Sequence, residues 1–447
     1  ISEIAENFTK NICEKLSEGK TLAQIEPEML EEAKECAARL TEAYILHINA
    51  QIKLDKAGRR KAGFSVERRE DERRLQTQIG EITYRRDYYK KASGGYEYLT
   101  DTILGVESRE RVSEGLSLLL VKAAKDMSYE KASRYLTGGE VSRQTVMGRV
   151  RLSEADITET VEKRRVPEIH IDADEDHITL CGGKNSEVPL ISVYEGIERQ
   201  GKRGKCKKIF HISEYGKEPD ELWEQVLTEI EKRYDLTDTK IYLHGDGADW
   251  IQTGLEWIQG SIFVLDKYHK NKAILSMTAG FEEDDRETLN REIRWSLENE
   301  EIRYFDELIT SLCQQQPERS EKIVESAGYL HRFVEGISIC KKDPCANNGG
   351  CTEPHVSHIL SARLSSRPMV WSRKTLKKLA PVLACGDLTL QRKERETELP
   401  QPLHKAVKKA KTTFRKGALG SPNPDAIGTL PITGRTTGTQ KLLKLLT

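Results

Sequence analysis

Three carboxylates occupy separate parts of the sequence, and each lies at or beside a predicted structural element. Asp174 and Asp246 lie within or directly after hydrophobic runs typical of strands, and Glu353 opens a helical pattern. Carboxylates that converge from separate elements bind two divalent metal ions, which activate an attacking oxygen and neutralise a leaving oxygen in phosphodiester transfer. Mg²⁺ and Mn²⁺ prefer carboxylate and water ligands, so we expect one of these ions as the cofactor. The triad therefore predicts metal-dependent phosphodiester chemistry.

The first of these positions has two candidates. Asp172 and Asp174 share one face of a strand because side chains alternate between faces, and the sequence favours Asp174 while leaving Asp172 as the alternative. Asp246 stands between glycines in HGDGADW, a pattern that is also typical of a turn. Three such carboxylates in a matching order of elements favour a site over three unrelated turns.

Further polar residues lie near the second and third carboxylates. Asp266 and His269 are three residues apart in VLDKYHK, at the end of a predicted strand. Such a pair positions a scissile phosphate or a neighbouring carboxylate, and a histidine that supports the fold is the alternative. Beyond Glu353, the predicted helix and the segment just after it carry four residues suited to a DNA strand beside the metal ions: His355, His358, Arg363 and Arg367.

The cysteines and the charge pattern argue against other classes of protein. Nine cysteines, an odd number in a long chain, do not indicate a disulfide framework. The only cluster, Cys340, Cys345 and Cys351, contains no CxxC pair, so we expect no zinc there. The net charge is -1 although 32% of residues are charged, so attraction to a polyanion depends on local basic stretches, at 56–74 and 373–416.

The central part of the sequence predicts an α/β domain. The strand-like runs EIHIDADEDHITL, VPLISVYEGI and KCKKIFHISEY precede a helix at 219–234, and a strand, a helix and a strand follow in KIYLHGDGADW, WIQTGLEWIQ and SIFVLD. This is the order of a ribonuclease-H-like core, in which the first strand is central and the fourth lies beside it. Asp174 and Asp246 then lie on neighbouring strands. A Glu-, Arg- and Leu-rich stretch at about 270–336 predicts an all-helical insertion before Glu353.

The segment MSYEKASRYLTGGEVSRQTVMGRVR predicts a helix, a tight turn and a second helix. Ser128 and Ser142 are suited to cap the two helices, and two consecutive glycines supply the turn. The second helix presents side chains suited to base edges and phosphates in a major groove: Arg143, Gln144, Thr145 and Arg149. We therefore predict a helix-turn-helix DNA-binding region, with a plain helical hairpin as the alternative.

Four domains are expected from these changes of pattern: 1–95, 96–160, 161–372 and 373–447. The first combines a helical arm, which continues into the charged segment DKAGRRKAGFSVERREDERR, with a strand pair in LQTQIGEITYRRDYYK. The last is a basic tail that ends in a stretch rich in Gly, Pro and Thr. The arginines and tyrosines of the strand pair either contact a nucleic acid or belong to an ordinary half-buried strand: Tyr84, Arg85, Arg86, Tyr88 and Tyr89.

The sequence also bears on location. Its longest apolar run, LSLLLV, is far shorter than the ~20 residues of a membrane span. The N-terminal residues lack the basic and then apolar layout of a signal peptide. We therefore expect an intracellular protein with no membrane partner.

Across nearly its whole length the sequence resembles the ISLre-two family of bacterial insertion-sequence transposases, which are more loosely related to the Mutator superfamily of DDE transposases. The segments that carry the resemblance are IGEITYRRDYY, SYEKAS, VSRQTV, DADEDH, HGDGADWI, LDKYHKNK, CTEPHVSHILSARLSSRPMVWS and LPITGRTTGTQKLLKLL. The resemblance implies an Asp-Asp-Glu triad at Asp174, Asp246 and Glu353, and a D-x-x-H element matched by Asp266 and His269.

The same resemblance implies an activity and partners. Such an enzyme cuts and rejoins DNA at terminal inverted repeats with a 3′ hydroxyl as the attacking group. It would bind double-stranded DNA, both its own ends and a target, as a homo-oligomer associated with the bacterial nucleoid in the cytoplasm. Two other functions remain open. One is a related nuclease or resolvase that cuts without strand transfer, and the other is a non-catalytic DNA-binding protein derived from a transposase.

Overall fold

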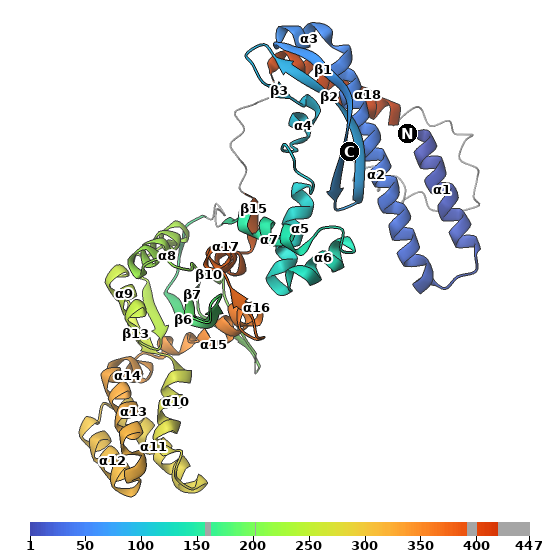
Figure 1. Ribbon diagram of the computed structural model, residues 1–447. Helices are drawn as coiled ribbons and strands as arrows, with labels where there is room; N and C mark the ends of the chain where they lie inside the picture. The colour runs from blue at the N-terminus through green and yellow to red at the C-terminus, as the bar shows by residue number, and fades with distance from the viewer. Residues whose placement is uncertain (157–161, 202, 391–399, 419–447) are drawn as a thin grey trace, which may run out of the picture. The chain divides into compact units, whose positions relative to one another are not determined.

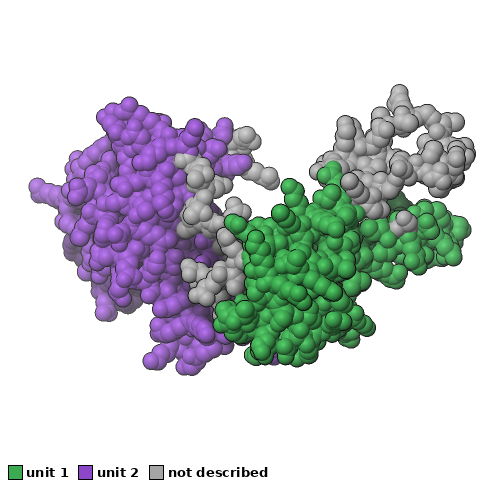
Figure 2. Space-filling view, turned by 90° about the horizontal axis from the view of Figure 1, so that it is seen from above, with its two compact units in different colours: residues 1–116, 393–447 green, residues 117–392 purple. Residues whose placement is uncertain are grey.

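Helices and strands alternate in a mixed α/β arrangement in the computed structural model, which describes residues 1–156, 162–201, 203–390 and 400–418 (Figure 1). The chain forms two compact units (Figure 2): unit 1 contains residues 1–116 and 393–447, and unit 2 contains residues 117–392. The Gly-, Pro- and Thr-rich end predicted from the sequence falls in 419–447, outside the described residues.

Unit 1 combines helices from the start of the chain with a β-hairpin and one helix from near its end. Its elements are α1 (Ser2–Ser17), α2 (Leu22–Leu54), α3 (Lys56–Lys61), β1 (Phe64–Thr77), β2 (Gly80–Lys91), β3 (Tyr96–Glu97), α4 (Leu99–Leu104) and α18 (Gln401–Ala418). The predicted strand pair is confirmed, but its first strand begins at Phe64, inside the charged segment. Phe64 and Val66 face inward opposite β2. The alternation of apolar residues is so short, and the residues after it so highly charged, that the sequence pattern did not indicate a strand here.

The core of unit 1 joins residues that are more than 350 positions apart. Ile48 and Ile52 of α2 pack with Tyr89 of β2 and with Leu403 and Ala410 of α18. Figure 1 shows α18 running beside α2 and α3. α18 is therefore part of the folded unit, whereas the sequence had placed these residues in a basic tail.

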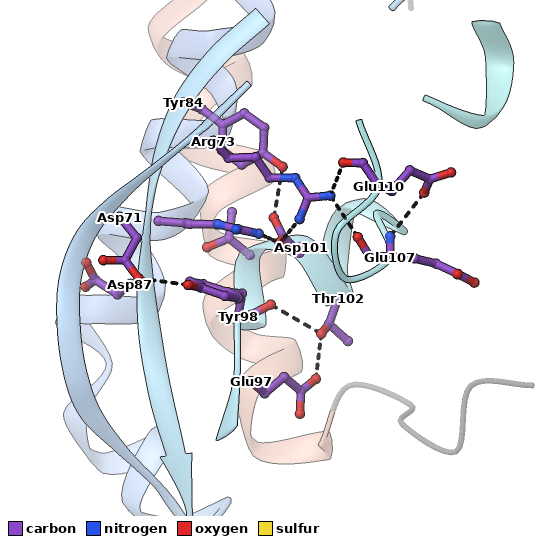
Figure 3. A network of polar contacts seen from close by, with 12 residues as sticks. Asp71, Arg73, Tyr84, Asp87, Glu97, Tyr98, Asp101, Thr102, Glu107 and Glu110 are labelled. Carbon is purple, nitrogen blue, oxygen red and sulfur yellow. Dashed lines mark hydrogen bonds and ion pairs between the residues drawn. The ribbon is translucent and has the colours of Figure 1, made fainter. Parts of the chain in front are cut away.

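A buried ionic network connects the hairpin of unit 1 to α4 (Figure 3). Asp101 accepts hydrogen bonds from Arg73 Nη1 at 2.8 Å and from Tyr84 Oη at 2.9 Å, and it also pairs with Arg86. Arg73 further donates to the carbonyls of Glu107 and Glu110. Tyr84 and Arg86 are thus directed into the protein, which supports the half-buried strand over a nucleic-acid contact at these residues.

Unit 2 is built on a mixed sheet. Its main strands are β6 (Glu168–Leu180), β7 (Asn185–Tyr194), β10 (Phe210–Ile212), β12 (Lys240–Gly245) and β13 (Ile262–Leu265), in the spatial order β10-β7-β6-β12-β13. β7 is antiparallel to both β6 and β10, whereas β12 is parallel to both β6 and β13. The predicted arrangement, with the first strand central and the fourth beside it, is confirmed.

Helices cover both faces of this sheet. α8 (Pro219–Arg233) and α9 (Asp249–Trp257) pack against the apolar face, with Trp223, Val226 and Ile230 on Ile169 and Ile171. α15 (Thr352–Val356) and the π-helical turn η3 (Ser357–Ser361) pack on the opposite face of β6, and α17 (Arg373–Ala384) contacts both η3 and β10. The remaining short elements are β4 (Ser153–Asp156), β5 (Arg164–Arg165), β8 (Ile197–Gln200), β9 (Arg203–Cys206), β11 (Tyr234–Asp235), α16 (Ala362–Leu364), β14 (Val370–Trp371) and β15 (Asp387–Leu390).

A run of helices separates β13 from α15. It contains α10 (Lys267–Thr278), α11 (Glu283–Glu298), α12 (Ile302–Gln315), η1 (Pro317–Arg319), α13 (Ser320–Arg332), α14 (Val334–Lys342) and η2 (Pro344–Asn348). These helices bury a core of their own around Ile293, Phe305, Leu312 and Leu330. The helical insertion predicted at about 270–336 is therefore present, with helices from 267 to 348.

Upstream of the sheet, α5 (Glu114–Asp126) leads into a helical hairpin of α6 (Tyr129–Thr137) and α7 (Arg143–Leu152). The predicted caps are confirmed, because Ser128 Oγ accepts from Lys131 N and Ser142 Oγ accepts from Thr145 N. Gly138 and Gly139 supply the turn with positive φ angles of 61° and 96°. The hairpin belongs to unit 2, since α7 packs on α17.

Candidate active site

Three aspartates lie next to one another across three neighbouring parallel strands: Asp246 and Asp266 directly follow β12 and β13, and Asp174 lies within β6 just past its last pairing with β12. His244 of β12 pairs with Asp172 of β6, so the next residues on that face are Asp246 and Asp174. Gly245 pairs with the last residue of β13, and the amide of Asp266 donates to the carbonyl of Gly245 at 2.9 Å. The carboxyl ends of parallel strands are the usual place for ligand sites in α/β sheets. The sheet therefore gathers Asp174, Asp246 and Asp266 beside the carboxyl ends of β12 and β13, and these three residues form the aspartate row.

Four polar residues alternate along one face of β6, and three of them hold the segment that contains Glu353 or its neighbours. His170 Nδ1 lies 3.0 Å from His244 Nε2, and a side chain at Gly349 would collide with both rings. Asp176 accepts hydrogen bonds at 2.8 Å from the hydroxyls of Ser361 and Ser365. The period of two in HIDADED was visible in the sequence, but the partners on residues 349–365 were not.

Asp172 is the third of these anchoring residues. Its carboxylate accepts from the amides of Gly350 at 3.2 Å and Cys351 at 2.8 Å, and from Tyr194 Oη at 2.9 and 3.0 Å. Burial alone would raise the pKa of Asp172, but hydrogen bonds from His355 and Tyr194 and the nearby His244 outweigh it and hold the pKa below its usual value. The side chain is 1% exposed. Asp172 is a buried anion with its oxygens fully used by the protein.

Asp174, the fourth residue, makes no hydrogen bond to another segment among the residues that the structure describes. Its carboxylate accepts a hydrogen bond from the amide of the adjacent Glu175, at 2.9 Å. Burial raises the pKa of Asp174 to about 7, and the negative charges of Glu175 and Asp246 act in the same direction, while the Glu175 amide and His269 oppose it. The two candidates for the first position thus differ in their surroundings, and Asp174 has the carboxylate that is available to a ligand.

Asp246 lies in a turn that directs it toward the same edge. Its Oδ1 accepts from the amide of Ala248 at 2.8 Å, so the turn inferred from the flanking glycines is present. Its backbone carbonyl accepts a hydrogen bond from Tyr329 Oη at 2.7 Å, which connects α13 of the helical insertion to the aspartate row. Burial raises the pKa of Tyr329, with the charges of Asp246, Asp266 and Asp174 acting in the same direction. No signal in the helical sequence around Tyr329 indicated this contact.

The pair of Asp266 and His269 lies beside the two aspartates. Asp266 is 2% exposed and caps α10 by accepting from the amides of Tyr268 at 2.8 Å and His269 at 3.2 Å. His269 Nδ1 lies 3.3 Å from Asp266 Oδ2. A hydrogen bond to Asp266 raises the pKa of His269 against the effect of burial, and the charges of Asp174, Asp266 and Asp246 raise it further. The three carboxylates therefore favour the protonated form of His269.

Glu353 lies in the first turn of α15, two residues after the Cys351 amide that Asp172 holds. α15 packs against β6 and β7, so the helix is fixed to the strand that carries Asp174. His355 is directed toward Asp172, with its Nδ1 3.6 Å from Asp172 Oδ2, and it also lies 3.7 Å from Cys206 Sγ. Glu353 is thus brought to the face of β6 that holds the aspartates, while His355 supports the fold.

One other group of residues has the spacing of a metal site. Within the described ranges, only Glu175, His177 and Glu187 bring three ligand atoms within 4.8 Å of one another. The oxygens of Asp174, Asp246 and Glu353 are more widely spaced than this. His177 and Glu187 are largely exposed, and Glu175 accepts a hydrogen bond from Trp250 Nε1 at 2.8 Å. The sequence reasoning did not single out this group.

Residues 15–398 match the model of UPF0236, an uncharacterised protein family. The chain belongs to this family. A UPF0236 protein of Caldanaerobacter subterraneus subsp. tengcongensis is 37% identical over 383 residues, which cover 84% of this chain and 81% of the relative. A second from the same organism, whose name joins eleven locus labels, is 37% identical over 389 residues, covering 85% and 82%. A UPF0236 protein of Streptococcus gallolyticus, named for its position in the vanSb 3′ region, is 24% identical over 348 residues, covering 73% and 74%.

The predicted DNA-binding residues of this UPF0236 chain lie on α7 in different environments. Arg143 and Gln144 are exposed, whereas Thr145 and Arg149 are partly buried and Thr145 Oγ1 lies 3.0 Å from Ser142 Oγ. Two of the four side chains therefore face solvent at the start of α7. Arg363, predicted as a cation beside the third carboxylate, is instead buried, where it donates to the carbonyl of Ala124 at 2.8 Å.

The described helices also bear on the expectation about membranes. None of them combines the length and the apolar character that crossing a bilayer requires.

Proposed function

We propose that this chain is the DNA transposase of an insertion sequence, with a ribonuclease-H-like catalytic core of the DDE type. Its triad would be Asp174, Asp246 and Glu353, with Asp266 and His269 beside it. It would bind terminal inverted repeats and carry out metal-dependent strand cleavage and strand transfer. A single observation carries the proposal: the sheet gathers aspartates on neighbouring parallel strands, and burial raises the pKa of one of them, Asp174, to about 7.

The residues at this edge fit a divalent cation. Their donors are carboxylate oxygens, which Mg²⁺ and Mn²⁺ prefer. Burial raises the pKa of Asp174, the negative charges of Glu175 and Asp246 act in the same direction, and a bound cation would offset both effects. Asp174, Asp246 and Glu353 would hold the ions. When bound, the ions would help to deprotonate the attacking oxygen and neutralise the leaving oxygen.

The protein's own groups would orient the DNA around these carboxylates. Asp172 fixes the amides just before Glu353, so the third carboxylate is carried on a segment tied to the central strand. His269, whose pKa is raised by Asp266, would present a positive charge to the scissile phosphate. Arg143 and Gln144, exposed at the start of α7, would contact the edges of bases in the terminal repeats.

The relatives add indirect support. One name that joins eleven locus labels in a single organism is what a sequence present in many copies would receive. Copies at many loci are a property of mobile elements. The sequence resemblance to insertion-sequence transposases extends over the same residues that form the aspartate row.

The experiment uses the full chain and linear DNA that carries the inverted repeats bracketing its gene. With Mg²⁺ or Mn²⁺, Asp246→Asn and Glu353→Gln should each reduce strand cleavage by at least about a hundredfold, since losses of the groups that merely orient metal ligands already cost about 10–100-fold. Gel shifts should show that both variants still bind the ends. His269→Ala should fall within that 10–100-fold range with little change in melting temperature.

Several outcomes would contradict the proposal or narrow it. Wild-type cleavage by either carboxylate variant would exclude the triad. Cleavage without joining of the 3′ ends to a target would identify a nuclease or resolvase. Binding without any cleavage in either metal would identify a non-catalytic DNA-binding protein.

Arg143→Ala combined with Gln144→Ala should weaken binding to the ends more than binding to scrambled DNA, at about 1–3 kcal/mol per lost base contact.

A further inference from the structure

A basic groove lies in unit 1, whereas the aspartate row belongs to unit 2. It is formed where the end of α2 and helix α3 meet the first turns of α18, and its volume is about 720 Å³. Lys61 lines one wall, and Lys405 and Lys409 line the other. Asp55 is the acidic residue of the lining, and its Oδ1 already accepts a hydrogen bond from the amide of Gly58 at 3.0 Å.

Two of the helices that form this groove, α3 and α18, carry basic residues and no acidic ones. Neither α3 (KAGRRK) nor α18 (QPLHKAVKKAKTTFRKGA) contains an aspartate or glutamate. α18 buries Leu403, Val407 and Ala410 against the unit, so its lysines are left on the outer face. The exposed cations of this outer face are Lys405, Lys408, Lys409, Lys411 and Arg415.

The lysines of the groove differ from several cations on α1 and α2 in the same unit. On α1 and α2, Lys10, Lys34 and Arg39 each lie within 4 Å of a glutamate on their own helix. In the part of the chain that the structure describes, neither Lys61 nor Lys405 nor Lys409 has a carboxylate at such a distance. Three cations without a carboxylate partner, on two facing walls of one groove, fit an anionic ligand.

The chemistry of the groove favours a nucleic-acid backbone over a membrane. A helix that binds lipid inserts apolar side chains beside its cations, whereas α18 has its apolar side chains buried against α2. Two walls of ammonium groups suit a strand of regularly spaced phosphates. We propose that this groove binds the phosphate backbone of duplex DNA without regard to sequence. The proposal goes beyond the catalytic function, because it needs neither the aspartate row nor any cleavage.

The test measures DNA binding in the absence of chemistry. Fluorescence anisotropy with a 30-base-pair duplex of arbitrary sequence, in EDTA and over a range of KCl concentrations, would compare the full chain with the triple variant Lys61→Gln, Lys405→Gln, Lys409→Gln. The variant should bind roughly tenfold or more weakly at low salt. The slope of log K against log salt concentration should fall by about 2.7, at ~0.9 per lost phosphate contact.

A matched triple variant removes the same charge elsewhere in the unit: Lys10→Gln, Lys34→Gln, Arg39→Gln. It should retain the affinity and the salt slope of the unchanged protein. Equal losses in both variants, or no loss in the groove variant while its thermal melting is unchanged, would overturn the proposal. So would binding to phosphatidylserine vesicles that depends on the groove lysines while DNA binding does not. Because EDTA prevents cleavage, failure here leaves the proposed catalytic function to its own test.

Discussion

Both units contain charged groups that are buried or partly buried, but the charges of the neighbouring groups differ between the units. In unit 1, the carboxylate of Asp101 is surrounded by Arg73, Arg86 and Tyr84, so the charges of this network have partners of opposite sign. In unit 2, the partly buried Asp174 and Asp246 lie on neighbouring parallel strands with like charges, and burial together with these charges raises the pKa of Asp174 to about 7. Buried charges with complementary partners support a fold, whereas buried charges of one sign indicate a place where a ligand supplies the missing charge.

The same contrast exists within a single strand. Asp172 and Asp174 are two residues apart on one face of β6, yet the pKa of Asp172 is lowered and that of Asp174 is raised. Burial acts on both carboxyl groups, but at Asp172 a hydrogen bond with His355, the nearby His244 and a hydrogen bond from Tyr194 outweigh its effect on the pKa. Substitutions at these aspartates therefore test one idea. A carboxylate whose charge has partners within the protein should support the fold, and a carboxylate without such partners should serve the function.

The largest effect is expected for Asp101→Ala. This change leaves Arg73 and Arg86 buried without a carboxylate, and breaking a buried pair in this way costs about 3–5 kcal/mol. Urea unfolding monitored by circular dichroism should show this loss in the free energy of unfolding of unit 1. Glu67→Ala, at an exposed site on β1, is the control and should change stability by less than about 0.5 kcal/mol. A similar small effect of Asp101→Ala would show that the network contributes little.

An intermediate effect is expected for Asp172→Asn. The amide cannot accept at both positions, so at least one of the Gly350 and Cys351 amides loses its charged acceptor, and hydrogen bonds to charged groups contribute about 1.5–3 kcal/mol. The free energy of unfolding of unit 2 should fall by about 2 kcal/mol. Asp284→Asn on the exposed surface of α11 is the control. Unchanged stability with loss of metal-dependent cleavage would instead make Asp172 the first ligand.

An effect of the opposite sign is expected for Asp174→Asn. The raised folded pKa means that ionisation of Asp174 destabilises the folded protein, fully so above about pH 7 and progressively less as the pH falls toward the ordinary value of 3.8. In EDTA, the variant should therefore be more stable than the unchanged chain at pH 8. Its advantage should shrink by about 2–3 kcal/mol on going to pH 5. Thermal melts across this range measure it, and a constant difference would contradict the raised pKa.

Much of unit 2 was predictable because its signals are local. The period of two in EIHIDADEDHITL, the apolar spacing at 219–234 and the serine caps of α6 and α7 depend on neighbours within a few residues. The order of the strands followed from the order of these elements. The positions of Asp174 and Asp246 on adjacent strands were therefore predictable from the sequence.

The partners of the site residues were not predictable, because they come from distant segments. The groups that distinguish Asp172 from Asp174 include His355 and the amides of residues 350 and 351, and those two amides lie almost 180 positions further along the chain. Arg86 looked suited to a DNA backbone until its carboxylate partner on α4 was known. The hairpin of β8 and β9 and the contact of Tyr329 with Asp246 likewise have no signature within a short window of sequence.

The pairing of α2 with α18 has a consequence for synthesis of the protein on the ribosome. Ile48 cannot pack against Leu403 until Leu403 has been synthesised, about 350 residues later. At about 5–20 residues per second this takes roughly 20–70 seconds. The sheet of unit 2 is translated entirely within that interval, so the domain encoded in the middle can fold before the one that was started first. During this delay the apolar side of α2 is exposed in the nascent chain, which makes it a natural place for a chaperone to bind.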